Sequence, residues 1–454
     1  MNDTFMKEKP IFPLLTSMAL PMVVSMLVNA LYNIVDSLFV ARISEEAMTA
    51  LSLVYPVQNL INAIAIGFSI GIAALISLHL GAGNKEKADM AATHGMVLSL
   101  IHGVVISIVC TAIMPRFLRS FTSDETVIAM GVTYSRVAFM FAVVIMAAMS
   151  FEKIFQAVGR MNITMIGLMG GSVCNIILDP IFIFGFGMGV KGAALATIIS
   201  QAVSCGWVLA FLTGKKTFLR IKKEYLKPVP SIVFPCLALG LSTFVMQSSE
   251  SVISVCFNSS LLKYGGDLAV GAMTILTSTM QFAMLPLQGI GQGAQPIMSY
   301  NYGARNIDRM KKTFKLHLVI SLIYSTLFWL FVQLFPATFA GIFSSDPELV
   351  SFTAGALRIY CGAMFLFGIQ LACQMTFVAI GYAVCSIIVA VVRKFVLLLP
   401  LIFIVPMFVS NKTMGVYMAE PIADAIAVTF TAIIFAIQFR KALRLIEGTK
   451  KAAA

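Results

Sequence analysis

Runs of about 20 apolar residues recur along the whole chain, and no other feature of the sequence restricts its fold as strongly. A helix of that length spans the hydrocarbon core of a bilayer. Of all residues, 59% are hydrophobic and only 11% are charged, which is more apolar surface than a soluble core needs. The sequence therefore predicts an all-α integral membrane protein with twelve transmembrane helices. These lie near residues 14–39, 51–80, 91–115, 130–155, 162–186, 190–213, 230–260, 269–299, 314–340, 352–380, 384–409 and 413–438.

The basic residues are divided unevenly between the predicted loops, and this division sets the expected orientation. The net charge is +12, but most Lys and Arg residues sit in short loops between apolar runs, where they orient a membrane protein. If the N-terminus is inside, the cytoplasmic segments hold 21 Lys and Arg residues and the outer loops hold 6. We therefore expect both termini in the cytoplasm, and we expect no nucleic-acid partner.

The two halves of the chain repeat each other at a constant offset of 222 residues. Because each half holds six apolar runs, both halves enter the membrane in the same sense. This gives two parallel six-helix bundles related by a pseudo-two-fold axis. We predict bundles at residues 1–213 and 231–454, joined by a basic cytoplasmic linker at 214–230, with the substrate between them. The matched pairs include Gly67/Gly289, Gly71/Gly293, Ser77/Ser299, Gly81/Gly303, Asn84/Asn306, Asp124/Asp346, Arg136/Arg358 and Gly159/Gly381.

Two kinds of glycine motif have a structural interpretation. The segment Gly81-Ala-Gly-Asn84 follows an apolar run, as does its counterpart at 303–306, so both predict the end of a helix with a glycine C-cap. Gly67 and Gly71 are four residues apart, which is the spacing that lets two membrane helices approach closely. We expect this pair to serve helix packing.

Carboxylates inside the apolar runs are the main functional candidates, because an ionisable side chain is costly in a membrane. Asp36 and Asp179 lie in the outer half or the middle of the first and fifth runs, and their counterparts in the second repeat are not acidic. Asn33 precedes Asp36 by three residues and Asn175 precedes Asp179 by four, so each amide shares a helix face with its carboxylate. A dehydrated carboxylate can exchange a proton or hold a small cation. This is the chemistry that an ion-coupled antiporter needs.

The second half carries three more acids and two bases at membrane depth. Glu250 lies in the seventh run and is a candidate for cation binding or for a local hydrogen bond. Glu420 and Asp424 lie in the twelfth run, and we expect them to neutralise Arg393 and Lys394 of the eleventh run.

Other polar residues in the runs have simpler interpretations. Glu152 and Lys153 lie at the cytoplasmic end of the fourth run, where the lysine is expected to extend to water. Gln281 and Gln288 are seven residues apart in the eighth run, and two interpretations stay open for them: lining of the central cleft, or ordinary packing. The eight cysteines form no Cys-x-x-Cys pair, so we predict buried thiols and no structural metal site.

Several segments carry a resemblance to a known family. They are Asn33-Ile-Val-Asp36-Ser-Leu-Phe-Val, Asn175-Ile-Ile-Leu-Asp179-Pro-Ile-Phe, Gly81-Ala-Gly-Asn84 and Ala419-Glu-Pro-Ile-Ala-Asp424. Over essentially its whole length the chain resembles the multidrug and toxic compound extrusion (MATE) family, in particular its bacterial MepA-like members. The resemblance implies a V-shaped pair of six-helix bundles in the bacterial inner membrane. Such a protein exports cationic, amphiphilic drugs in exchange for H+ or Na+.

The same resemblance assigns roles to residues of the first bundle. Asp36, Asn175 and Asp179, with Tyr32 and Thr197 nearby, look like the ion-coupling cluster of the family. Asn33 joins this set because it precedes Asp36 on the same helix. A sodium ion is then expected to bind at Asp36 and Asp179 if Na+ is the coupling ion.

The resemblance also extends to the second bundle. Glu250 resembles an acidic position that another branch of the family uses in its seventh helix, so we assign Glu250, Gln281 and Gln288 to substrate binding. No cofactor is expected besides the coupling ion, H+ or Na+. The expected partners are organic cations and membrane lipid, without an obligate protein partner.

Two other functions are alternatives to drug export. A lipid-linked oligosaccharide flippase has a similar architecture, but it should place basic residues in the cleft for a pyrophosphate, whereas the deep bases of this chain are few and close to acids. A membrane-embedded enzyme would need a nucleophile, a base or a metal site, and the four histidines form no such motif. No Gly-Lys-Ser/Thr phosphate loop occurs, so an ion gradient is expected to drive transport.

Overall fold

The structure is a computed structural model that describes residues 5–213 and 219–453. Within these ranges every regular element is a helix and no strand occurs, as the apolar runs predict. Of the predicted linker at 214–230, residues 214–218 lie outside the described residues. The remainder forms a loop that contains a short 3-10 turn, η2 (Lys223–Tyr225), and ends where the next helix begins at Pro230.

The first half of the chain forms one continuous series of helices. Two of them, α5 and α6, together make a single span that bends by 44°. Side-chain caps fix several helix starts: the side chains of Ser44, Asn84 and Asp124 each accept a backbone N–H at the beginning of the following helix. The elements are α1 (Phe5–Glu8), α2 (Ile11–Ala41), α3 (Glu45–Gly81), α4 (Lys85–Arg119), α5 (Glu125–Met140), α6 (Ala142–Ala157), α7 (Met161–Pro180), the π-helical η1 (Ile181–Gly185) and α8 (Val190–Thr213).

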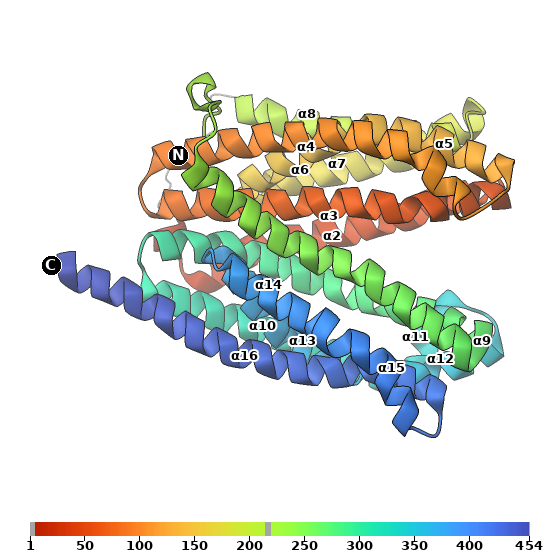
Figure 1. Ribbon diagram of the computed structural model, residues 1–454. Helices are drawn as coiled ribbons and strands as arrows, with labels where there is room; N and C mark the ends of the chain where they lie inside the picture. Colours follow the sequence, from red (N-terminus) through yellow and green to blue (C-terminus); the bar gives the residue numbers. More distant parts are fainter. Residues whose placement is uncertain (1–4, 214–218, 454) are drawn as a thin grey trace.

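The second half begins with the long α9 (Pro230–Gly303), which is interrupted at Gly266. The φ angle of Gly266 is 64°, a left-handed value, and the chain turns back there, so α9 comprises two helices at residues 230–265 and 267–303 (Figure 1). The other elements are α10 (Ile307–Leu334), α11 (Pro336–Phe343), α12 (Pro347–Tyr360), η3 (Met364–Leu366), α13 (Phe367–Ala379), α14 (Ala383–Val391), the π-helical η4 (Val392–Leu398), α15 (Leu399–Phe408) and α16 (Lys412–Ala453).

The number of spans follows from these breaks. In the part of the chain that the structure describes, nine helices are long and apolar enough to cross a membrane, and two bent pairs raise the number to eleven. The second bent pair, α12 with residues 364–379, turns by 46°. Dividing α9 at Gly266 adds one more, which gives the expected twelve.

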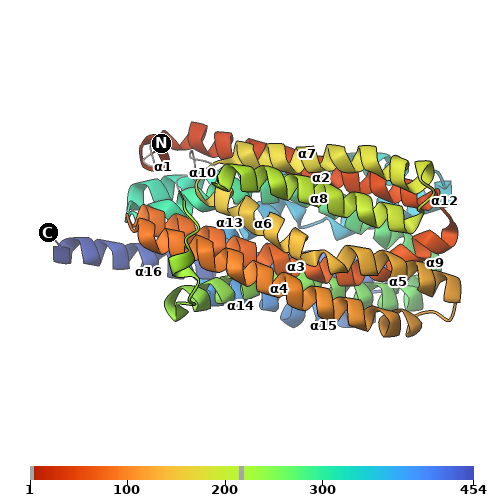
Figure 2. The same ribbon diagram turned by 90° about the horizontal axis from the view of Figure 1, so that it is seen from above.

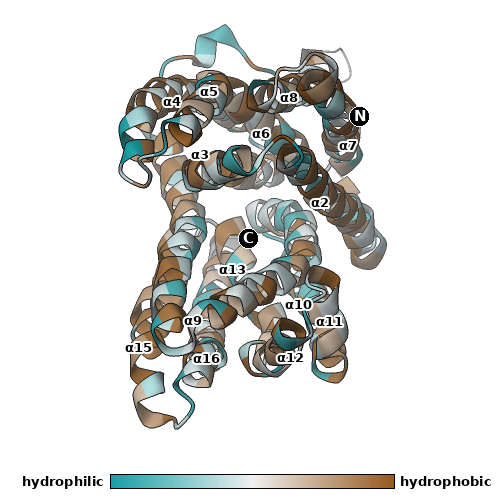
Figure 3. Ribbon diagram, turned by 90° about the vertical axis from the view of Figure 1, so that its right-hand side faces the viewer, coloured by the Kyte–Doolittle hydropathy of each residue, from teal (hydrophilic) through white to brown (hydrophobic). Residues whose placement is uncertain are grey.

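The helices gather in two groups, one formed by α2–α8 and the other by α9–α16 (Figure 1). Both chain ends lie on the same side of the molecule, which we call the terminal end, and α16 projects beyond the other helices there (Figure 2). The opposite side is called the distal end. Seen from the distal end, the two groups stand apart, and their helices carry mostly hydrophobic residues (Figure 3).

The repeat predicted from the sequence recurs in individual contacts. The Ser77 hydroxyl donates to the carbonyl oxygen of Ala157 over 2.8 Å, and the Ser299 hydroxyl donates to that of Ala379 over 2.7 Å. Both pairs are related by the offset of 222 residues, so each bundle fastens its second helix to its fourth in the same way. The predicted helix ends after Gly81 and Gly303 are confirmed as well.

The two bundles meet closely near the terminal end, along what we call the inter-bundle seam. A side chain at Gly81 would collide with the backbone of Tyr300, and a side chain at Gly303 would collide with the backbone of Leu78. Leu78 and Tyr300 are themselves counterparts in the repeat, so the seam is pseudo-symmetric. Glycines are required at these positions because the helices touch backbone to backbone.

The seam continues toward the middle of the helices. A Cβ atom at Gly67 would lie 2.6 Å from the carbonyl oxygen of Gly240, and one at Gly71 would lie 2.7 Å from that of Cys236. The prediction that Gly67 and Gly71 serve packing is therefore confirmed, and their partner is the first helix of α9. In this conformation the bundles are joined at the terminal end and separate toward the distal end (Figure 1).

The N-terminal segment crosses the seam. Arg309 of α10 donates through Nη2 to the carbonyl oxygens of Met6 (2.8 Å) and Lys9 (2.7 Å). Asn301 of α9 also donates to the carbonyl oxygen of Met6, over 3.3 Å. The Met6 side chain is buried in a hydrophobic cluster that includes residues of both bundles, among them Ile297. This segment therefore ties the start of the first bundle to the second.

Candidate functional site

Two aspartates from different helices of the first bundle meet inside it. Asp36 lies near the distal end of α2 and Asp179 near the distal end of α7, and their carboxyl groups are within hydrogen-bonding distance of each other. Asp179 is fully buried. Among the described residues, no donor reaches the Oδ1 atom of either aspartate. The pair can therefore share one proton, or its free oxygens can bind a small cation.

The local backbone around Asp179 is irregular. Pro180 follows it directly and the chain continues as the π-helical η1, so the regular i to i−4 hydrogen bonds are interrupted beside the carboxylate. Asn175, one turn earlier, is 1% exposed. With the amide oriented to satisfy its neighbours, Asn175 donates to Oδ2 of Asp179 over 3.0 Å and accepts from the backbone N–H of Thr197 over 3.3 Å. Asn175 thus fixes the Asp179 side chain to α8.

Tyrosines complete the surroundings of the carboxyl pair. Tyr32 of α2 lies near enough to interact electrostatically with both aspartates. Tyr134 of α5 does the same, and its hydroxyl donates to Gln58 of α3 over 3.4 Å. Sequence reasoning missed Tyr134 and Gln58, because no carboxylate lies within two helical turns of either residue in the sequence and no motif connects them to Asp36 or Asp179.

A small polar cavity adjoins the carboxyl pair on its terminal side. Its volume is about 20 Å³, which is room for one water molecule. Side chains of α2, α7 and α8 line it, including those of Asn29, Tyr32, Ser172, Asn175, Thr197 and Gln201. Two of these, Tyr32 and Asn175, also surround the aspartates, so the cavity and the carboxyl pair form one continuous polar region.

Several predicted site residues lie outside this region or join it in an unexpected way. The Asn33 side chain is exposed, so the structure does not bring it into the buried group around Asp36. Thr197 takes part through its backbone N–H, while its hydroxyl donates to the carbonyl oxygen of Ala193 over 3.0 Å. In the second bundle, Gln281 is exposed and Gln288 is half-buried, both on the second helix of α9.

A second charged cluster lies in the second bundle, where the predicted pairing of Glu420 and Asp424 with two bases is confirmed. Arg393 Nε lies 2.7 Å from Asp424 Oδ1, and Arg393 Nη2 lies 3.5 Å from Glu420 Oε1. Lys394 Nζ lies 2.9 Å from Glu250 Oε1 and 3.8 Å from Glu420 Oε1. Both bases belong to the π-helical η4. Three acids and two bases give this cluster a formal charge of −1, and Glu250 is its accessible end because its side chain is 55% exposed.

The expectation that Lys153 extends to water is wrong. Lys153 is 5% exposed and lies in the inter-bundle seam, with Glu152 (8% exposed) beside it. The expectation placed the residue at the end of the helix, but α6 is half of a bent span, and its buried face meets the second bundle. The amine finds hydrogen-bond acceptors there instead of solvent.

Comparison with known proteins agrees with this architecture. The MatE family profile matches residues 21–181 and 242–404, well over half of the chain. The chain is 26% identical over 366 residues to a protein of Staphylococcus haemolyticus named "Multidrug export protein MepA", with 80% of each chain covered.

Solved structures give the same result for the fold. One described as "Crystal structure of MATE in complex with MaL6" has a TM-score of 0.93 and 25% identity, covering 98% of this chain and all of the other. Another, described as "Outward-facing conformation of a multidrug resistance MATE family transporter of the MOP superfamily", also has a TM-score of 0.93 and 25% identity, covering 98% and 99%. With a profile match in both bundles and the same fold over nearly its full length, this chain belongs to the MatE family of membrane transporters.

Proposed function

We propose that this protein is a secondary-active antiporter that exports cationic or amphiphilic organic compounds in exchange for H+ or Na+. The observation that carries the proposal is the contact between Asp36 and Asp179 inside the first bundle. Two charged carboxylates in contact repel each other strongly in a medium of low dielectric constant. Binding of a proton or a sodium ion removes that repulsion, so occupancy by the coupling ion changes the energy of the site.

The surroundings of the pair support exchange of the ion. Asn175 holds one oxygen of Asp179, and the Oδ1 atoms of both aspartates remain available to a proton or cation. The adjoining polar cavity of about 20 Å³ has room for a water molecule that would carry a proton or hydrate an ion. Alternating access of the two bundles would expose the site and the substrate to one side of the membrane at a time.

The second bundle supports the cationic class of substrate. Its charged cluster has one more acid than base, and the excess is presented at Glu250, whose side chain is more than half exposed. An organic cation bound near Glu250 would compete with Lys394 for that carboxylate. The name of the relatives, multidrug export protein, is consistent with export of such compounds by this chain, and drug resistance would follow from it.

The distribution of basic residues also indicates how the protein is oriented in the membrane. Both termini lie at one end of the molecule, where the basic segments of the chain are also concentrated (Figure 1). The excess of positive charge favours the cytoplasm for that end. The separated distal end would then face outward across the bacterial cell membrane.

The flippase alternative is not favoured by the basic residues. It would need Arg393 and Lys394 to be available to a pyrophosphate, but both are engaged with Glu250, Glu420 and Asp424. Arg393 also packs 4.9 Å from the centre of the Phe367 ring. The two bases therefore serve the cluster itself.

Efflux of a fluorescent organic cation from proteoliposomes tests the proposal. The wild-type protein and the Asp36→Asn and Asp179→Asn variants would be compared under a proton gradient, a sodium gradient or no gradient. We expect one gradient to drive efflux in the wild type and both substitutions to abolish the dependence on it. Parental efflux rates in normally inserted variants would sink the proposal.

A further inference from the structure

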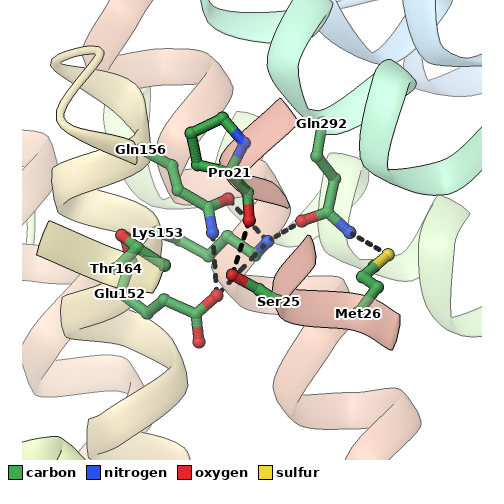
Figure 4. A network of polar contacts seen from close by, with 8 residues as sticks. All are labelled: Pro21, Ser25, Met26, Glu152, Lys153, Gln156, Thr164 and Gln292. Atoms are coloured by element: carbon green, nitrogen blue, oxygen red, sulfur yellow. Dashed lines mark hydrogen bonds and ion pairs between the residues drawn. The ribbon is translucent and has the colours of Figure 1, made fainter. Parts of the chain in front are cut away.

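Four buried polar side chains connect the two bundles in the middle of the seam (Figure 4). Lys153 Nζ of α6 donates to Gln292 Oε1 of α9 over 2.6 Å and to Gln156 Oε1 over 2.7 Å. Gln156 Nε2 in turn donates to Glu152 Oε1 over 2.7 Å, and that oxygen lies 4.0 Å from Lys153 Nζ. Of these contacts, the bond between Lys153 and Gln292 is the one that crosses from the first bundle to the second.

The group is deeply buried, which makes the crossing bond strong. Glu152, Lys153, Gln156 and Gln292 are 8%, 5%, 3% and 8% exposed. A hydrogen bond from an ammonium group is stronger than one between neutral groups, and water competes little for it at this depth. If the bundles separated at this level, Lys153 would lose Gln292 and would need water in its place.

The six-helix fold does not require this group, because three of its four members have apolar counterparts in the repeat. The counterparts of Lys153, Gln156 and Gln292 are Met375, Val378 and Ile70, which carry no charge or amide. The second bundle has the same architecture with Met375 and Val378 in place of Lys153 and Gln156, so a structural need of the six-helix bundle cannot explain these side chains. A role in the contact between the two bundles explains why each of these side chains occurs in only one of the two repeats.

We propose that Lys153 and Gln292 form the gate that holds the terminal end closed in this conformation. The proposal rests on alternating access in the proposed function, and it concerns positioning residues that touch neither the coupling ion nor the carboxyl pair. Glu152 and Gln156 orient the lysine toward Gln292. Opening of the terminal end separates Lys153 from Gln292, so the strength of this bond sets the balance between the two conformations.

The chain contains its own reporter of gate opening. Cys236 is 4% exposed and packs in the seam, where its backbone touches Gly71 and its side chain belongs to a cluster with Ile70 and Leu239. Opening of the terminal end would expose this thiol. Cys361 is fully buried within the second bundle, away from the seam, so it responds only to unfolding.

The experiment measures alkylation of these two cysteines by N-ethylmaleimide in the purified, lipid-reconstituted protein, with each peptide quantified by mass spectrometry. Gln292→Leu removes the acceptor across the seam and leaves Glu152 and Gln156 in place. We expect its Cys236 to react roughly ten-fold faster than in the wild type, the change that follows from losing a hydrogen bond to a charged group. Cys361 should react at the wild-type rate.

A second variant predicts the opposite sign. Gln292→Glu replaces the neutral acceptor by a charged one, so it should slow alkylation of Cys236 below the wild-type rate and also slow transport. Gln374→Ala serves as the matched control, since Gln374 is the buried counterpart of Glu152 and should leave Cys236 unchanged. A merely structural contact would not move the reporter in both directions.

Three outcomes would overturn the proposal. They are an unchanged Cys236 in Gln292→Leu, equal acceleration of Cys236 and Cys361, and faster alkylation of Cys236 in Gln292→Glu. The assay uses no gradient and no substrate. Failure of cation transport in proteoliposomes is therefore distinguishable from failure of the gate.

Discussion

Arg305 has the left-handed backbone conformation that Gly83, its counterpart in the first repeat, also adopts. The φ angles are 54° for Arg305 and 73° for Gly83, and each residue lies in the turn that follows the close contact of the seam. Glycine enters this region without strain, whereas an L-residue with a side chain is strained there. The second repeat therefore keeps the turn geometry with a less suitable residue.

Exchanging these residues should change stability in opposite directions. Arg305→Gly should raise the free energy of unfolding by up to about 1 kcal/mol, because it relieves the left-handed strain of the side chain. Gly83→Ala should lower it by about 1 kcal/mol for the same reason. Thermal unfolding of the purified variants in detergent checks both signs, and a stabilising Gly83→Ala would contradict the argument.

A side chain introduced at Gly81, where the two bundles touch backbone to backbone, should reduce transport. A leucine at position 81 would collide with the backbone of Tyr300, so Gly81→Leu should disfavour the closed terminal end by about 1–3 kcal/mol. Efflux in proteoliposomes should fall, and Cys236 should become alkylated faster. Gly170→Leu is the matched control, because nothing lies within 4 Å of a Cβ there. Equal effects of the two substitutions would remove the special role of the seam.

Asn175 should be needed for transport because it positions Asp179. Asn175→Ala removes the donor to Oδ2 of Asp179 and the acceptor for the N–H of Thr197. Loss of a hydrogen bond to a charged group corresponds to a roughly ten-fold or larger effect, and we expect at least that reduction in gradient-driven efflux. Cys174→Ala, one residue away and only half-buried, should retain the parental rate. Parental efflux in Asn175→Ala would separate Asn175 from ion coupling.

The charged cluster of the second bundle predicts strong coupling between Arg393 and Asp424. Their bond of 2.7 Å is buried, so Asp424→Leu alone should destabilise the protein by about 3–5 kcal/mol, since it leaves the arginine with less compensation. The double variant Arg393→Met with Asp424→Leu should recover much of this loss. A double-mutant cycle on thermal unfolding measures the coupling, and additive effects would show that the two residues act independently.

Much of the fold was accessible from the sequence because the bilayer imposes a simple rule on it. Apolar runs of sufficient length predict the spans, and the offset of 222 residues relates Ser77 to Ser299, whose hydrogen bonds in the structure are equivalent. The runs could not show that two spans are bent or that the chain turns back between the two helices of α9 at a single residue, Gly266. Those features depend on packing between helices rather than on composition.

The site was only partly accessible for a related reason. Asp36, Asn175 and Asp179 stood out because they are polar residues in apolar runs, and their meeting in space follows from the packing of α2 against α7. Tyr134 and Gln58 gave no such signal. The sequence gives the depth of Lys153 along its helix, but it does not give the neighbour across the seam. That neighbour, Gln292, is 139 residues away in the chain.

The attachment of Met6 to Arg309 bears on how the protein is made. Met6 is synthesised 303 residues before Arg309, its partner in the folded protein. The N-terminal segment therefore cannot dock until α10 has been synthesised and inserted. Closure of the terminal end is therefore completed late in biogenesis. Until then the N-terminal segment of the nascent first bundle stays unattached.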